Sequence, residues 1–167
     1  MSLVLVAVSK YLTKLAGDGV RIRIVGDRSA VSDKLRRAWE HAELLTQHND
    51  RITLAVAFNY GGRWDVVQAC RRALAEGVDP ETVDEEWLSR HMALSFAPDP
   101  DLFIRTGGEM RMSNFLLWQA AYSELFFTEC LWPDFGEVEI DAALTAFAQR
   151  DRRFGGIRPQ PVVREDR

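Results

Sequence analysis

Residues 101–132 read DLFIRTGGEMRMSNFLLWQAAYSELFFTECLW and contain the most informative pattern of the chain. This stretch opens with an apolar run at residues 102–104, which predicts a short strand. A glycine turn, TGGE at residues 106–109, follows this run, and residues 115–122 have the apolar character and length of a short helix. A strand, a glycine turn and a helix start in this order are typical of α/β folds, whose loops carry ligand sites at the ends of strands.

Two arginines near this turn indicate an anion site. Arg105 ends the apolar run, and Arg111 stands two positions before Ser113. Guanidinium groups form paired hydrogen bonds with phosphate oxygens, and glycines allow backbone N–H groups to turn toward an anion. A helix that starts after Ser113 would add its own unpaired N–H groups. The combination predicts a phosphate or diphosphate site.

Each part of this pattern also has a purely structural interpretation. Ser113 is a suitable N-cap for a helix, and Gly107 and Gly108 suit a turn with positive φ. The arginines are compatible with ordinary surface positions. Their concentration within nine residues favours the site, although the sequence alone leaves both interpretations open.

The rest of the chain alternates between helical and strand patterns. The helical spacing of apolar residues predicts a helix at residues 3–16. Alternation of apolar and charged residues predicts a strand at residues 20–24 with one solvent-exposed face. After a helix at residues 30–48, the continuous apolar run at residues 52–58 predicts a strand that is buried on both faces. The motif NYGGR at residues 59–63 then stands where α/β sheets bind ligands, and a plain strand-to-helix turn explains its glycines equally well.

Further elements are predicted before, within and after residues 101–132. Helices are expected at residues 65–75 and 83–94, a short strand at 125–127 and a last helix at 137–150. In that last helix, the side chains expected to point inward are Ile140, Leu144 and Phe147. Strands that alternate with helices predict an α/β fold with a mostly parallel sheet flanked by helices.

Length and composition bound the domain count and the functional class. We expect one domain at residues 1–156 and a loose tail at residues 157–167. A formal net charge of −4 argues against a general nucleic-acid-binding protein, because such proteins are basic. Cys70 and Cys130 lack CxxC spacing, so we expect buried free thiols in a reducing, cytoplasmic compartment. No apolar run reaches the length of a membrane span, and we expect no signal peptide at the start.

A longer ordered set of motifs carries a family resemblance. In chain order the motifs are NYGGR at 59–63, IRTGGE at 104–109, RMSNFLLWQ at 111–119, Tyr122-x-Glu124, LWPDF at 131–135 and RRFGG at 152–156. Together they closely resemble the cis-prenyltransferase family, of the undecaprenyl diphosphate synthase type. The resemblance extends over residues 20–156.

The sequence also departs from the family pattern. The family begins with a strand and a loop that reads roughly DGNGRW and binds the allylic diphosphate, and a later segment reads roughly FSxENW. Neither segment occurs in these 167 residues. The resemblance therefore implies an N-terminally truncated form of the family fold.

The resemblance implies a reaction, a cofactor and an assembly. The family condenses isopentenyl diphosphate with an allylic diphosphate, such as farnesyl diphosphate, to form a cis-polyprenyl diphosphate. It implies Mg²⁺ as cofactor, with Glu124 as a metal ligand, and a homodimer. It also implies peripheral association with the inner face of the membrane through the lipid product.

Site residues are carried over from the family position by position. As catalytic residues the resemblance implies Arg105, Arg111 and Glu124. The residues that it implies for substrate binding are Arg105, Gly107, Gly108, Arg111, Ser113, Arg153 and Gly155, of which the last two would act across the dimer interface.

Three hypotheses follow from the sequence. The first is a prenyltransferase, in a truncated form whose activity alone is low because the segment that binds the allylic diphosphate is missing. The second is a non-catalytic partner subunit of a cis-prenyltransferase complex. The third is an α/β domain whose anion site binds another phosphate.

Overall fold

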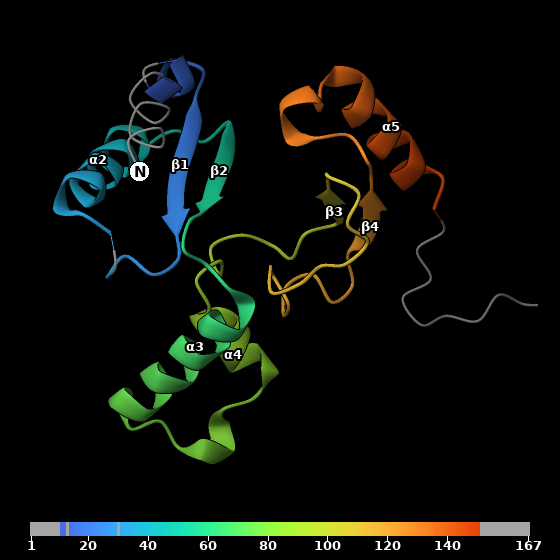
Figure 1. Cartoon of the computed structure of the whole chain (residues 1–167). Coiled ribbons are helices and arrows are strands. Elements are labelled where there is room, and N and C mark those ends of the chain that lie inside the picture. Colours follow the sequence, from blue (N-terminus) through green and yellow to red (C-terminus); the bar gives the residue numbers. More distant parts are fainter. Residues whose placement is uncertain (1–10, 13, 30, 151–167) are drawn as a thin grey trace, which may run out of the picture. The chain divides into compact units, whose positions relative to one another are not determined.

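A computed structural model describes residues 11, 12, 14–29 and 31–150 (Figure 1). Residues 11, 12 and 14–17 are helical, and the rest of the helix predicted at 3–16 lies outside the described residues. Arg153, Gly155 and the predicted tail also lie outside them. In the described part the elements are, in order, β1 (Val20–Val25), α2 (Asp33–Thr46), β2 (Ile52–Ala57), α3 (Gly62–Glu76), the 3₁₀ turn η1 (Pro80–Thr82), α4 (Glu85–His91), β3 (Leu102–Arg105), β4 (Glu124–Phe127), the 3₁₀ turn η2 (Trp132–Asp134) and α5 (Glu137–Ala148).

The chain divides into two compact units. Among the described residues, the first unit comprises those up to residue 100 and residues 111–123, and the second comprises residues 101–110 and 124–150. Each unit holds one pair of parallel strands, β1 with β2 and β3 with β4, among the described residues. Parallel strands flanked by helices confirm the predicted α/β class, while the single domain expected at residues 1–156 stays a prediction.

The core of the first unit lies between β1 and α2 (Figure 1). The strands β1 and β2 pair in register from Val20 opposite Ile52 to Val25 opposite Ala57, and α2 connects them. The indole of Trp39 on α2 meets the ring of Phe58 edge-on, with centroids 5.0 Å apart. The buried members of this cluster are Leu12, Ile22, Ile24, Leu35, Trp39 and Ala42.

The side chains of β2 are exposed, so the prediction of a strand buried on both faces is wrong. Ile52 keeps 60% of its surface accessible, and Leu54 and Val56 are also exposed. The physical reason is that α2 packs mainly against β1. A continuous apolar run does not reveal which of two neighbouring strands a helix will cover.

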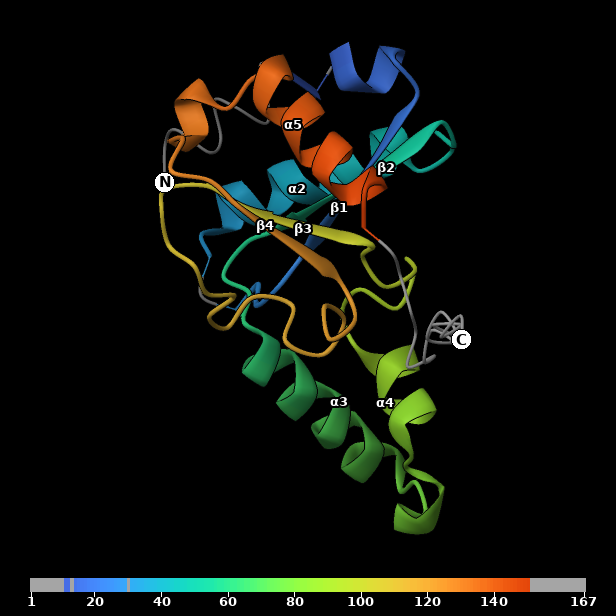
Figure 2. The same ribbon diagram turned by 90° about the vertical axis from the view of Figure 1, so that its right-hand side faces the viewer.

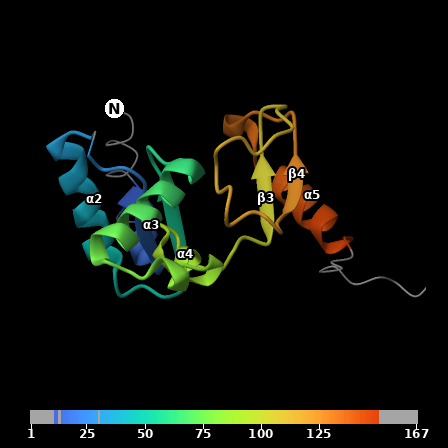
Figure 3. The same cartoon turned by 90° about the horizontal axis from the view of Figure 1, so that it is seen from below.

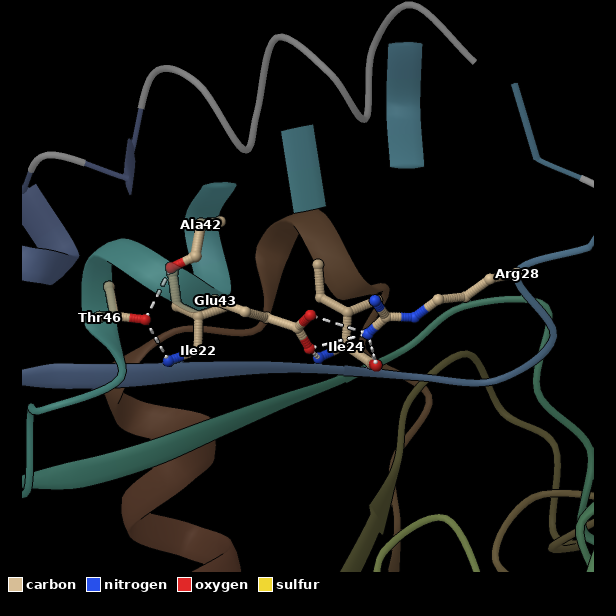
Figure 4. Close-up of polar contacts among 6 residues, drawn as sticks. All are labelled: Ile22, Ile24, Arg28, Ala42, Glu43 and Thr46. Carbon is tan, nitrogen blue, oxygen red and sulfur yellow. Dashed lines mark hydrogen bonds and ion pairs between the residues drawn. The ribbon is translucent and has the colours of Figure 1, made fainter. Parts of the chain in front are cut away.

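Side chains of α2 bond the backbone of β1 (Figure 4). The hydroxyl of Thr46 accepts the N–H of Ile22 at 3.0 Å and donates to the Ala42 carbonyl at 2.8 Å. The Oε1 atom of Glu43 accepts the N–H of Ile24 at 2.8 Å. Alternate N–H groups of β1 are therefore satisfied by side chains, as buried donors require.

Residues that flank α2 bond the carbonyl groups of the same strand. Nη2 of Arg28 donates to the Ile24 carbonyl at 2.6 Å and to both carboxylate oxygens of Glu43, at 2.8 and 2.9 Å (Figure 4). Nδ2 of Asn49 donates to the Val20 carbonyl at 2.9 Å. These bonds fix α2 along the length of β1.

The helices α3 and α4 lie side by side in the first unit (Figure 2). The left-handed Gly77, with φ of 64°, ends α3, and its N–H donates back to Ala73 and Leu74. The helix α4 begins at the N-cap Asp84, whose carboxylate accepts the N–H of Trp87 at 2.7 Å. Both helices confirm the sequence prediction, with shorter bounds for α4.

Residues 115–122 do not form the predicted helix but a series of turns. Ser113 and Leu116 adopt left-handed conformations, with φ of 56° and 49°. A left-handed residue breaks the repeating hydrogen-bond pattern of an α-helix, and two of them separated by two residues exclude one. Ser113 therefore does not act as a helix N-cap, which has an extended backbone.

The second unit contains β3, β4, the turn η2 and α5 (Figure 3). The strands pair in parallel, with Leu102 opposite Glu124 and Arg105 opposite Phe127. The helix α5 packs against β4 and buries Ala143 completely. Ile140 and Leu144 are exposed, so their predicted inward orientation is wrong, because the buried stripe of α5 is centred on a small residue.

The two cysteines are not buried as predicted. Cys70 is exposed on α3, and Cys130 is partly exposed in the loop after β4. Both thiols are free. No helix in the described part of the chain is long and apolar enough to cross a membrane.

Candidate functional site

The predicted site residues fall in both units. Arg105, Gly107, Gly108 and Glu124 belong to the second unit, and Arg111 and Ser113 belong to the first. Arg153 and Gly155 lie outside the described residues. Their assignment to substrate binding stays a prediction.

The glycine turn runs along the residues that follow β4. Gly107 and Gly108 have φ of 88° and 79°, a region that favours glycine. Their N–H groups donate to the carbonyls of Cys130 and Thr128, each at 2.9 Å, and the N–H of Thr128 donates to the Arg105 carbonyl at 3.0 Å. The two glycine N–H groups are thus bonded to protein carbonyls rather than turned toward an anion, and the glycines shape the loop that follows Arg105.

Arg105 occupies the last position of β3, where its side chain is about one quarter exposed. One guanidinium nitrogen lies 3.9 Å from a carboxylate oxygen of Glu109. At that distance the ion pair is weak. A phosphate group that approaches Arg105 would compete with Glu109 for the guanidinium group.

Glu124 lies at the other end of the same strand pair. It is the first residue of β4 and stands opposite Leu102, whereas Arg105 stands opposite Phe127 at the carboxyl ends. Three residues along a strand span about 10 Å. Within the second unit, the carboxylate of Glu124 and the guanidinium of Arg105 therefore belong to opposite ends of the strands.

The residues around Glu124 do not fit a magnesium site on their own. Among the described residues no group of three or more His, Cys, Asp or Glu side chains could hold a metal ion. Oε2 of Glu124 is engaged by Nη1 of Arg150 at 2.7 Å. Mg²⁺ in proteins is bound through one or two carboxylates together with substrate phosphates, and here a single carboxylate is already bonded to a cation. The assignment of Glu124 as a metal ligand stays a prediction.

In the first unit, the segment that carries Arg111 and Ser113 is attached to the start of α3. The carbonyl of Asn114 accepts the N–H of Gly62 at 2.6 Å, and Oδ1 of Asn114 accepts the N–H of Arg63 at 3.0 Å. The NYGGR motif was a candidate ligand position by sequence. In this structure, residues of the chain itself occupy the first donors of the helix.

A buried carboxylate holds the same segment further along. Asp65, which is 1% exposed, accepts the Tyr60 hydroxyl at 2.8 Å, the Ala93 N–H at 2.8 Å and Nε2 of Gln119 at 3.3 Å. Burial, followed by the hydrogen bond to Asp65, raises the pKa of the Tyr60 hydroxyl above its ordinary value of 10.0. The ring of Tyr60 also contacts Phe115, with centroids 6.0 Å apart.

The sequence did not single out Asn114, Asp65 or Gln119 as residues that shape the site. Asn114 and Gln119 lie inside the quoted motif RMSNFLLWQ, and Asp65 lies in the first turn of α3. Most of their partners are distant in sequence, up to 54 residues apart, so spacing along the chain contains no sign of these bonds.

Comparisons with known proteins agree with the sequence motifs. The sequence model of a family described as putative undecaprenyl diphosphate synthase matches residues 1–155. An isoprenyl transferase from Neisseria gonorrhoeae is 47% identical over 167 residues, which cover 100% of this chain and 66% of that protein. A ditrans,polycis-undecaprenyl-diphosphate synthase, (2E,6E)-farnesyl-diphosphate specific, from Escherichia coli K12 is 48% identical over 164 residues, with 95% of this chain and 64% of that protein covered.

A solved structure shows the same fold. The crystal structure of a probable undecaprenyl diphosphate synthase from Campylobacter jejuni aligns with a TM-score of 0.83 at 33% identity, and covers 92% of this chain and 72% of that one. The chain spans slightly less than two thirds of the length of the curated relatives it matches. By the family model, the relatives and the fold, the chain belongs to the undecaprenyl diphosphate synthase family of cis-prenyltransferases.

Proposed function

We propose that this chain acts in cis-polyprenyl diphosphate synthesis, and that Arg105, Arg111 and Ser113 bind the diphosphate of isopentenyl diphosphate. The observation that carries the proposal is the set of two arginines and a serine within nine residues, inside the region that the family model matches. The allylic co-substrate would be farnesyl diphosphate or a related compound, in keeping with the printed name of the Escherichia coli relative.

The chemistry of the condensation explains the need for arginines. The allylic substrate loses diphosphate and develops positive charge, the double bond of isopentenyl diphosphate attacks it, and a proton is then lost from the isopentenyl unit to restore a double bond. Charge separation dominates the barrier, so fixed groups that orient the reactants and oppose the developing charge lower it. A guanidinium group stays charged at all relevant pH values and bonds two phosphate oxygens at once. Arg105 and Arg111 would hold isopentenyl diphosphate by its diphosphate and so aim its double bond.

Both arginines are on backbone that the chain itself holds in place. Hydrogen bonds from Gly107, Gly108 and Thr128 fix the loop after Arg105. Asn114 fixes the segment after Arg111 to the start of α3. Preorganised donors lose little entropy when they bind a ligand, which favours tight binding of a small anion.

Calorimetry with inorganic diphosphate and with isopentenyl diphosphate tests the binding part of the proposal. Replacement of Arg105 or Arg111 by alanine should weaken binding by about 1.5–3 kcal/mol, because each removes charge-assisted hydrogen bonds. Arg36→Ala is a matched control, since Arg36 lies on α2 and pairs with Asp33 at the surface. Unchanged affinity in the Arg105→Ala/Arg111→Ala double variant would overturn the site assignment.

We further propose that these 167 residues alone elongate farnesyl diphosphate slowly. Loss of a single preorganised electrostatic group commonly costs about 10²–10³ in rate, and the sequence lacks the family loop for the allylic diphosphate. Incubation of the chain with farnesyl diphosphate, labelled isopentenyl diphosphate and Mg²⁺ measures this directly. Rapid formation of long cis-polyprenyl products would contradict it. Binding without turnover, together with stimulation of an added catalytic subunit, would instead support the partner-subunit hypothesis.

The cofactor, the assembly and the location are also proposals. We propose that Mg²⁺ supports the reaction and that Glu124 contributes to its binding, a point that a magnesium titration of the Glu124→Gln variant tests. We propose a homodimer in which Arg153 and Gly155 reach the partner's site. Sedimentation of the chain at micromolar concentration tests the dimer, and fractionation of cells tests a cytoplasmic location with peripheral attachment to the membrane.

A further inference from the structure

The start of α3 lacks a cap of its own. Its N-cap is Gly61, which has no side chain, so the first N–H groups of the helix need other acceptors. Asn114 supplies two of them. Its carbonyl accepts the N–H of Gly62 at 2.6 Å, and its Oδ1 accepts the N–H of Arg63 at 3.0 Å. Asn114 thus acts as a helix cap from a segment 51 residues further along the chain.

At both positions that face this segment, a side chain would meet a close neighbour. A Cβ atom at Gly61 would overlap Nδ2 of Asn114, and one at Gly62 would come within 2.8 Å of the Leu117 nitrogen. Gly61 has φ of −152°, which any residue adopts, so its reason for being glycine is this close approach and not its backbone angle. The two glycines thus allow the close approach of the segment that carries Asn114.

The contact adjoins the candidate diphosphate ligands. Asn114 directly follows Ser113 and stands three positions after Arg111. Ser113 is left-handed, with φ of 56°, and Leu116 on the far side is left-handed with φ of 49°. Two such residues cost free energy unless their surroundings hold them. Asn114 lies between these two residues in the sequence, and its two hydrogen bonds to the start of α3 hold the backbone on both sides.

We propose that Asn114 is the positioning residue for the diphosphate-binding segment: it fixes the backbone of Ser113 and Arg111 by capping α3. The inference rests on the proposed function and deepens it. It also distinguishes two roles that the N–H groups at a helix start can have, namely bonding to the protein itself and binding an anion. The N–H groups of Gly62 and Arg63 serve the protein, and the anion is bound by the side chains that precede Asn114.

The test compares diphosphate affinity in folded variants. Asn114→Ala should weaken the affinity for inorganic diphosphate about tenfold or more, because small displacements of binding groups are costly. Asn49→Ala is the matched control, since it removes another asparagine of the first unit, whose side chain donates hydrogen bonds to two backbone carbonyls at 3.0 and 2.9 Å. We expect it to lower the melting temperature while leaving diphosphate affinity within about twofold of the unsubstituted chain.

Gly61→Ala provides an independent second variant. Its new methyl group displaces the Asn114 side chain while leaving the asparagine in the sequence, so the affinity should fall here as well. In an Asn114→Ala background the overlap with Nδ2 is gone, and Gly61→Ala should then have little further effect. This non-additivity is expected for two residues in one contact. If Asn114→Ala does not fold, the Gly61→Ala variant carries the test.

The outcomes separate the inference from the function on which it rests. If the unsubstituted chain does not bind diphosphate, the proposed function fails and the inference fails with it. If the chain binds diphosphate and folded Asn114→Ala binds it equally well, the positioning role alone is overturned. Equal losses of affinity in Asn114→Ala and Asn49→Ala would also overturn it, because they would show a general effect of lower stability.

Discussion

Arg150 holds the carboxylate of Glu124, with Nη1 2.7 Å from Oε2, and Nη2 donates to the neighbouring Leu125 carbonyl at 3.1 Å. Glu124 begins β4, and Arg150 follows α5, so these bonds join the end of the helix to the start of the strand. The residue that the family pattern assigns to metal binding is therefore already paired with a cation of its own chain.

This pairing predicts a competition at Glu124. If Glu124 contributes to Mg²⁺ binding, the Arg150→Ala variant should bind Mg²⁺ up to about fivefold more tightly in the presence of diphosphate, because a partly exposed ion pair is worth up to about 1 kcal/mol. Magnesium titration by calorimetry measures the change. The Arg150→Ala/Glu124→Gln double variant should lose the gain, and an unchanged Mg²⁺ affinity in Arg150→Ala would argue against the metal-ligand role.

Two variants of Ser113 distinguish the contribution of its hydroxyl group to binding from the effect of its left-handed backbone on stability. Ser113→Gly and Ser113→Ala both remove the hydroxyl group, so both should weaken diphosphate binding by about 0.5–1.5 kcal/mol. Ser113→Gly should also stabilise the fold relative to Ser113→Ala by about 1 kcal/mol, since glycine adopts φ of 56° without strain. Calorimetry and urea unfolding measure the two effects. Full affinity in the glycine variant would show that the hydroxyl does not contact the ligand.

The hydroxyl of Thr46 predicts a loss of stability on replacement. Thr46 is fully buried and accepts the Ile22 N–H, so Thr46→Val leaves that donor without a partner at a cost of about 1–3 kcal/mol. Thr46→Ser keeps the hydroxyl and loses one methyl group, which should cost about 1 kcal/mol. Urea unfolding followed by circular dichroism compares the two. A valine variant as stable as the serine variant would contradict the importance of this bond.

Tyr60 predicts a decline in stability at alkaline pH. Burial and the bond to Asp65 raise the pKa of the Tyr60 hydroxyl, so the folded chain keeps this proton above pH 10 while the unfolded chain releases it. The unfolded state then binds fewer protons, and the free energy of unfolding falls as the pH rises above about 10. Tyr60→Phe should be less stable at neutral pH but should show a flatter decline. Identical slopes from pH 9 to 11 in both proteins would refute this.

The sequence predicted elements whose pattern is local. The strand at residues 20–24 and the helix at 30–48 correspond to β1 and α2, because alternation and helical spacing are properties of adjacent residues. The segment 115–122 failed for the opposite reason. Its apolar residues suit a helix, but Asn114 bonds α3 and two residues take left-handed angles, which no spacing rule detects.

The same division applies to the candidate site. Arg105, Arg111 and Ser113 were predicted as site residues because guanidinium and hydroxyl groups near glycines form a recognisable pattern, and their role stays a prediction. The bonds of the Gly107 and Gly108 N–H groups to residues after β4 were not predictable, since they depend on how a later loop returns. The glycines were identified correctly as a turn with positive φ, while the direction of their N–H groups required the structure.

The bonds between α2 and β1 have a consequence for self-association. The Val25 carbonyl accepts the Phe58 N–H, so the N–H groups of Ile22 and Ile24 point away from β2, toward the edge of the two-stranded sheet that the described residues form. Strands of other molecules can pair with an unpaired sheet edge, and fibrils can form from such pairing. At this edge of β1, the N–H and carbonyl groups are already hydrogen-bonded to the side chains of Thr46, Glu43, Arg28 and Asn49. A strand rich in valine and isoleucine is thereby closed to a neighbour, and the protection lies in four side chains outside the strand itself.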